Sequence, residues 1–208
     1  MSGDGVHVGR LHPSRAPDAG ELIAAGHGEY PGFRHVFPDP AVRRRVLRPL
    51  MVATARDAAV HGHALAADDG GGLLGVALWM PPGTFPMSRA RVARMAALVR
   101  MAWDGRGAVG RFMRVGAALA EAHPAHDCWY LQTMSVHPRA QRRRVGTGLM
   151  APALAITDEA GLPCYLQTSD SANVDYYRRF GFEVSQPVIA TYAGGPAYLG
   201  MARPVPCR

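Results

Sequence analysis

The segment from residue 136 to residue 150 places the strongest constraint on the fold. It contains the end of an apolar stretch at Val136, a turn at Pro138, an arginine-rich loop, and an apolar-periodic stretch that begins at Gly146. This order predicts a strand, a loop and then a helix. The first N–H groups of a helix have no partner within the helix, and the helix dipole adds partial positive charge there. Because such a helix end binds phosphate groups, the segment predicts a ligand that carries a phosphate or pyrophosphate.

Length and composition indicate one globular domain that spans residues 1–208. The chain has 208 residues, 48% of them hydrophobic, which suits a full core built without disulfides or metal. No apolar run reaches the ~18 residues that cross a bilayer, and the N-terminus has no hydrophobic signal core. We therefore expect a cytoplasmic protein without a membrane partner, either a monomer or a homodimer.

The charge and the cysteines argue against two further classes of protein. The net charge of +7 comes from 23 arginines, without any lysine. These arginines are scattered and lack interleaved aromatic residues that could stack on bases, so we expect no nucleic-acid partner. Cys128, Cys164 and Cys207 lie far apart and form no CxxC pair. We expect reduced thiols and no bound metal.

Hydrophobic periodicity predicts a mixed α/β sheet that is flanked by helices. An aromatic and proline-rich loop is expected at residues 30–40. Strands are expected at 6–11, 63–67, 73–80, 128–136 and 162–168, followed by two strands that end near Met201, and helices are expected at 17–28, 41–61, 146–160 and 174–180.

Two further amphipathic helices are expected between residues 88 and 121. The apolar face of the first ends in Ala102 and Trp103, and Arg91, Arg94 and Arg100 lie off this face. We expect these arginines to form a solvated face. The alternative is a rim that attracts an anionic substrate or the phosphates of a cofactor.

Two motifs then coincide in their order and spacing. The first is Val136-x-Pro138-x-x-Gln141-x-x-x-x-Gly146, and the second runs from Asn173 through Tyr177 to Phe182. Together they resemble the phosphate loop and the Asn … Tyr-x-x-x-Gly-Phe segment of the GNAT superfamily of N-acetyltransferases. The resemblance implies a single GNAT-like domain with a splayed, mostly antiparallel sheet flanked by helices. It also implies that acetyl-CoA is the cofactor.

The likeness extends over nearly the whole chain and is loosest from Ser88 to Glu121. Segments 29–35, 77–82, 123–131 and 194–203 are similar to the puromycin N-acetyltransferases and their relatives. This similarity implies that the chain acetylates a primary amine of a small molecule, such as an aminonucleoside or another antibiotic-like metabolite. Acetylation of a peptide or protein amine, and a non-catalytic acyl-CoA sensor, remain the alternatives.

The phosphate loop departs from the family pattern at one position. In the register set by Pro138, Arg144 takes the place of the family's first glycine. We expect an arginine there not to adopt a positive φ readily, and to offer its guanidinium to a pyrophosphate instead. A shifted register, Arg143-x-x-Gly146-x-Gly148, restores both small residues but lengthens the turn. The first register is favoured because Val145 then opens the helix.

The resemblance further implies which residues hold the cofactor. The strand at 133–136 is expected to diverge from its neighbour at 166–168, so that the pantetheine arm lies in the gap and bonds to the strand backbone. One N–H of this strand could also polarise the thioester carbonyl. Asn173 either binds the arm or pyrophosphate, or caps a helix. The expected cofactor-binding residues are Met134, Ser135, Val136, Gln141, Arg142, Arg143, Arg144, Val145, Gly146, Thr147 and Asn173.

Tyr177 matches the family's tyrosine and is the candidate general acid, while the adjacent Tyr176 is expected in the core. An ordinary tyrosine pKa of ~10 keeps such a residue protonated at neutral pH. The base is less defined, because relatives often carry a glutamate where this chain has Gln167. The substitutes considered are Glu29, Tyr30, His35, Asp39, His126 and Asp127, or water alone.

Aromatic residues in the first half of the chain are candidates for the acceptor pocket. Such a wall would suit a nucleoside or an aromatic amine. Core packing is the alternative for Phe37 and Trp79. The expected substrate-binding residues are Tyr30, Phe33, His35 and Trp79.

Overall fold

A seven-stranded sheet in the order β1-β2-β3-β4-β5-β7-β6 organises the fold. The computed structural model describes residues 5–100 and 107–205. All neighbouring strands run antiparallel except β4 and β5, which are parallel. The strands are β1 (His7–Arg10), β2 (His63–Asp68), β3 (Leu73–Met80), β4 (Trp129–Val136), β5 (Cys164–Thr168), β6 (Glu183–Ala190) and β7 (Ala197–Arg203).

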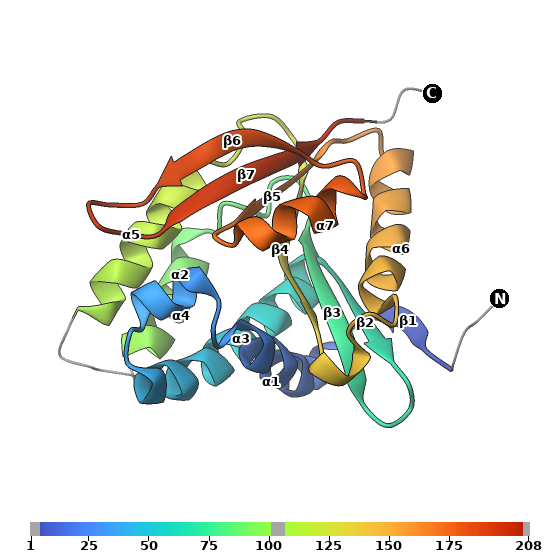
Figure 1. Cartoon of the computed structure of the whole chain (residues 1–208), viewed down its shortest axis with the longest axis horizontal. Coiled ribbons are helices and arrows are strands. Elements are labelled where there is room, and N and C mark those ends of the chain that lie inside the picture. The colour runs from blue at the N-terminus through green and yellow to red at the C-terminus, as the bar shows by residue number, and fades with distance from the viewer. Residues whose placement is uncertain (1–4, 101–106, 206–208) are drawn as a thin grey trace.

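Helices cover both faces of this sheet (Figure 1). The helices are α1 (Ala16–His27), α2 (Pro31–Val36), α3 (Pro40–His61), α4 (Arg89–Arg100), α5 (Ala108–Glu121), α6 (Val145–Glu159) and α7 (Val174–Arg178). Helices α1 and α3 contact one another extensively and together lie against β2, β3 and β4. Helix α6 contacts the same three strands. Among the described helices, none is long and apolar enough to cross a membrane.

Strand β3 shows why helices lie on both faces, since all eight of its residues are buried. Successive side chains of a strand point to opposite faces. Val76 and Leu78 join the apolar cluster that contains the residues of α1 and α3. Ala77 and Trp79 join a second cluster that contains Leu149 of α6. The prediction of a mixed sheet with helices on its faces is confirmed.

Three local predictions were wrong or incomplete. Segment 30–40 is not only a loop, because Pro31 opens the short helix α2 after extended Tyr30, a position that suits proline's fixed φ. The helix expected at 174–180 ends at Arg178. Arg91 is not solvated: its guanidinium donates to the carboxylate of Asp57, with Nε–Oδ1 at 2.9 Å, and only 11% of its side chain is exposed.

Some of the remaining predictions concern residues that the structure describes, and others concern residues that it does not describe. Cys128 and Cys164 are buried free thiols, as expected for reduced cysteines. Cys207 lies outside the described residues, as do Ala102 and Trp103, which were expected to complete the apolar face of α4.

Candidate active site

Strands β4 and β5 pair at one end and separate at the other. Trp129, Tyr130 and Leu131 pair with Cys164, Tyr165 and Leu166, and this parallel ladder then stops. The partner strand β3 continues along β4, with a register shift at which Gln132 has no partner. The backbone of residues 133–136 is therefore paired on the β3 side and lacks a strand partner among the described residues on the β5 side.

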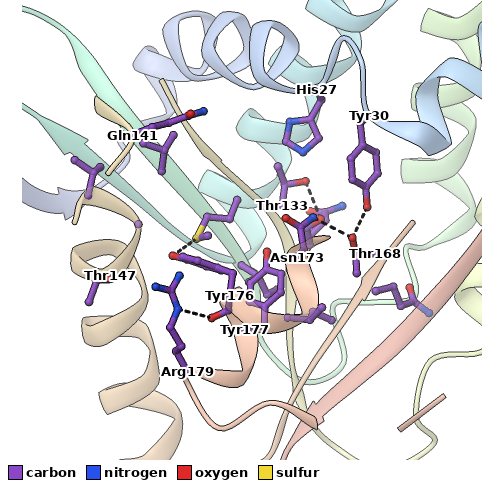
Figure 2. A pocket seen from close by; sticks show the side chains of 18 of the residues that line it. His27, Tyr30, Thr133, Gln141, Thr147, Thr168, Asn173, Tyr176, Tyr177 and Arg179 are labelled. Atoms are coloured by element: carbon purple, nitrogen blue, oxygen red, sulfur yellow. Dashed lines mark hydrogen bonds between the residues drawn. The ribbon is translucent and has the colours of Figure 1, made fainter. Parts of the chain in front are cut away.

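The gap opens into a cavity of about 670 Å³. Figure 2 shows Gln141 and Thr147 at one end of this cavity, and Tyr176, Tyr177 and Asn173 along one wall. His27 and Tyr30 point into it from the opposite side. The cavity thus extends from the expected phosphate loop to the aromatic segment that follows α1. It lies where strands β4 and β5 separate, as we expected for these two strands.

The phosphate loop adopts the register set by Pro138. Helix α6 begins at Val145, with Arg144 as its N-cap residue and no acidic residue in its first turn. Contrary to our expectation, Arg144 does take a positive φ, of 60°, and Arg142 has a φ of 62°. Helix α6 therefore begins at the cavity, where Gly146 and Thr147 line the wall, and the first N–H groups of a helix have no partner within it.

Most of the expected cofactor-binding residues line this cavity, and two do not. Ser135 is 7% exposed and faces α1, where its Oγ occupies the space beside Gly26. Arg143 is exposed. The cavity-lining members are Met134, Val136, Gln141, Arg142, Arg144, Val145, Gly146, Thr147 and Asn173.

Asn173 does not act as a side-chain cap. It precedes α7, yet its side chain makes no capping hydrogen bond. Its Nδ2 donates instead to Thr168 Oγ1 at 3.2 Å, and Asp170 caps the preceding turn through Ala172 N. The amide of Asn173 is therefore held at the end of β5, on the wall of the cavity.

The two tyrosines of α7 both face the cavity. Burial raises the pKa of Tyr177 above its ordinary value, so its hydroxyl is protonated at neutral pH. Tyr176 is not a simple core residue, because it lines the cavity under the guanidinium of Arg179, 4.8 Å from the ring centroid. Burial also raises the pKa of Tyr176, to about 12.

The aromatic wall proposed for the acceptor is only half present. Tyr30 and Phe33 line the cavity, and Tyr30 Oη lies 2.8 Å from Thr168 Oγ1. Trp79 is fully buried in the core that contains α6. His35 contacts the ring of Tyr192, with centroids 5.8 Å apart, and lines neither described cavity.

None of the acidic or histidine substitutes considered as bases lines the cavity. Glu29 pairs with Arg43, with atoms 3.1 Å apart. Asp39 accepts from the first N–H groups of α3. His126 and Asp127 are exposed elsewhere. Gln167 does line the cavity, but its Nε2 donates to Leu119 O at 2.9 Å.

The histidine that does line the cavity is His27, at the end of α1, which the sequence reasoning missed. Its Nδ1 lies 3.0 Å from the carbonyl oxygen of Ile23. Because a carbonyl can only accept, Nδ1 holds the hydrogen and Nε2 of the neutral ring has a free lone pair. Burial lowers the pKa of His27. The imidazole is therefore neutral at pH 7, with one nitrogen able to accept a proton.

Comparison with known proteins gives the same fold and the family. The model of the acetyltransferase (GNAT) family matches residues 28–182. The chain belongs to this family.

A curated relative is an uncharacterised N-acetyltransferase of Schizosaccharomyces pombe. It is 29% identical over 130 residues, which make up 58% of this chain and 52% of the relative. The chain thus spans about half the length of this relative.

Solved structures with the same fold cover almost the whole chain. The histone acetyltransferase HPA2 and related acetyltransferase from Corynebacterium glutamicum has a TM-score of 0.72 and 22% identity, with 98% of each chain covered. The polyamine N-acetyltransferase of Drosophila melanogaster has a TM-score of 0.67 and 13% identity, over 95% of this chain and 98% of the other. The PaiA N-acetyltransferase of Thermoplasma acidophilum, solved with coenzyme A, has a TM-score of 0.58 and 12% identity, over 98% and 99%.

Proposed function

We propose that the protein acetylates a primary amine of a small molecule, with His27 as general base and Tyr177 as general acid. The observation that carries the proposal is the single cavity between the separated strands, which joins the start of α6 to His27 and Tyr177. Similarity to the puromycin N-acetyltransferases suggests an aminonucleoside or another antibiotic-like metabolite as the acceptor.

Acetyl-CoA fits this site. The free N–H groups at the start of α6, together with the guanidinium groups of Arg142 and Arg144, would hold the pyrophosphate. The unpaired backbone edge at Met134 and Val136 would bind the pantetheine arm as a strand. When bound, acetyl-CoA supplies an acetyl group that is activated as a thioester.

Two side chains of the protein would move the protons. The amine nitrogen forms a bond to the acetyl carbon while the carbon–sulfur bond breaks. His27 Nε2 accepts the proton that the amine loses, and Tyr177 Oη donates a proton to the departing sulfur. Solvent then returns a proton from His27 to Tyr177, so the products are the acetamide and the free thiol. A positioned acid or base of this kind contributes roughly 10²–10⁴-fold in rate.

The proposal is tested by following thiol release from acetyl-CoA with a panel of small amines and, in parallel, with lysine-containing peptides. We expect release with free amines and none above background with peptides. Thermal shift with acetyl-CoA, against pantetheine as control, reports cofactor binding separately. Binding without thiol release from any amine would contradict the enzymatic proposal and favour a sensor, while faster release with peptides would favour a protein acetyltransferase.

A further inference from the structure

A second cavity adjoins the first. It has a volume of about 350 Å³ and lies among α3, α4, α5 and the segment before α4. Five residues line both cavities, so the two meet beside β4 and the start of β7. These shared residues are Phe33, Leu119, Gln132, Thr133 and Tyr198.

The lining of the second cavity is almost entirely apolar. Large hydrophobic side chains reach it from α2, α3, residues 85–87, α4 and α5, and among the described residues that line it none is charged. Of its polar groups, Thr54 Oγ1 donates to Leu50 O and Thr133 Oγ1 donates to Gln132 O. The hydrophobic members include Phe33, Met51, Phe85, Met95, Phe112 and Leu119.

One residue that lines both cavities has a buried acceptor atom without a partner. The side-chain Oε1 of Gln132 is buried and has no hydrogen-bond partner among the described residues. Gln132 is also the residue at which β4 shifts register against β3. A buried amide oxygen without a partner is destabilising, and a small rotation of the Gln132 amide would let the N–H of an amine at this junction supply one.

We propose that the second cavity binds the body of the acceptor, and that the acceptor is an amine on an apolar, ring-sized group without a second charge. This inference rests on the acetyltransferase function proposed above. The amine would lie beside Gln132 and Thr133, where the cavities meet, and its hydrocarbon body would fill the space between α3 and α5. A cavity of this size and lining is typical of small-molecule sites.

The same lining disfavours polyamines. A diamine or agmatine would place a second cation in a cavity whose described lining has no carboxylate. A buried cation that is not paired does not recover the hydration it loses. The chain therefore differs in its expected acceptor from the polyamine N-acetyltransferase of Drosophila melanogaster.

The first experiment measures kcat/KM for thiol release with propylamine, hexylamine, 3-phenylpropylamine, 1,6-diaminohexane and agmatine. Each methylene that enters the cavity should raise kcat/KM about fourfold. The second cation of 1,6-diaminohexane should lower it about 100-fold relative to hexylamine. Equal or better turnover of the diamine or agmatine would overturn the inference, while no release from any amine would overturn the proposed function with it.

The second experiment fills the cavity from α5. Gly116 lines the cavity, and a Cβ there would meet no atom within 4 Å. The substitution Gly116→Leu therefore starts without a clash at Cβ and favours the helix. Gly110→Leu is the matched control, since Gly110 lies on the same helix in equally open space but lines neither cavity.

We expect Gly116→Leu to lower kcat/KM for 3-phenylpropylamine at least about tenfold, and to leave propylamine and the thermal shift with acetyl-CoA unchanged. Gly110→Leu should change none of these. Ala120→Leu, at another position that lines the cavity, repeats the test with a different side-chain direction. If both filling variants retain the preference for 3-phenylpropylamine over propylamine, the second cavity does not bind the acceptor.

Discussion

Replacing Arg144 by glycine should make the protein more stable and its cofactor binding weaker. Arg144 has a φ of 60°, and the left-handed conformation costs a non-glycine residue roughly 1–2 kcal/mol. Glycine adopts this conformation without strain but adds about 0.4–1 kcal/mol of conformational freedom to the unfolded chain. The difference predicts a net stabilisation of about 0.5–1 kcal/mol, which raises Tm by about 1–4 °C in a domain of this size.

The same substitution, Arg144→Gly, should weaken the binding of acetyl-CoA. A charge-assisted hydrogen bond contributes about 1.5–3 kcal/mol, and the exposure of Arg144 places the expected loss near the lower limit. Loss of the guanidinium should therefore weaken acetyl-CoA binding about tenfold. Isothermal titration gives this affinity, and thermal or urea denaturation of the protein without cofactor gives the stability.

The matched control is Arg143→Gly. Arg143 is a neighbouring arginine without a positive φ, so glycine there relieves no strain and should lower stability by about 0.4–1 kcal/mol. If Arg144→Gly lowers Tm as much as Arg143→Gly does, the strain argument is wrong. If Arg144→Gly binds acetyl-CoA with unchanged affinity, Arg144 has no part in holding the phosphates.

Three further predictions follow from the site and the core. His27→Asn should lower kcat/KM about 10²–10⁴-fold. Because burial lowers the pKa of His27, the acid limb in the pH profile of wild-type kcat/KM should lie below pH 6.5. This limb should be absent in His27→Asn and retained in the control His35→Asn. Tyr177→Phe should lower kcat near the modest end of the same range with KM unchanged, and a wild-type kcat in stopped assays would exclude Tyr177 as the acid. Asp57→Ala leaves the buried guanidinium of Arg91 without its carboxylate. This change should lower the free energy of unfolding by about 3–5 kcal/mol and Tm by about 6–20 °C. A loss below about 1 kcal/mol, measured by urea denaturation, would show that the pair is solvated.

The pH dependence of stability gives a separate check on His27. Its pKa is lowered in the folded protein, so protonation favours the unfolded chain. The stability that neutral His27 contributes is fully present above its unfolded pKa of ~6.5. This stability is lost as the pH falls from there through the pKa of His27 in the folded protein. The fall in Tm between pH 7 and pH 5 should therefore be smaller in His27→Asn than in the wild type. An identical fall would show that His27 is solvated when folded.

Local patterns in the sequence determined the elements and the phosphate loop. The apolar run at residues 73–80 after the turn at 68–72 specified a strand. The cluster at Pro138, Gln141 and Gly146 specified where a helix begins. Both signals act between residues close in the chain. The two motifs also identified the family. Asn173 and Tyr177 of the second motif line the same cavity as the loop of the first motif.

Tertiary structure alone decided the rest of the site. Whether His27 or His35 faces the cavity depends on how α1 lies against β4 and how α2 lies against α3 and α5. The local sequence around the two histidines does not distinguish them. Trp79 joined the core because helices cover both faces of β3, and Arg91 became buried because Asp57 of α3 lies beside it. The second cavity exists only where separate segments of the chain meet, among them α2, α3, α4 and α5. Contacts between distant segments depend on packing in three dimensions, which periodicity along the chain does not encode.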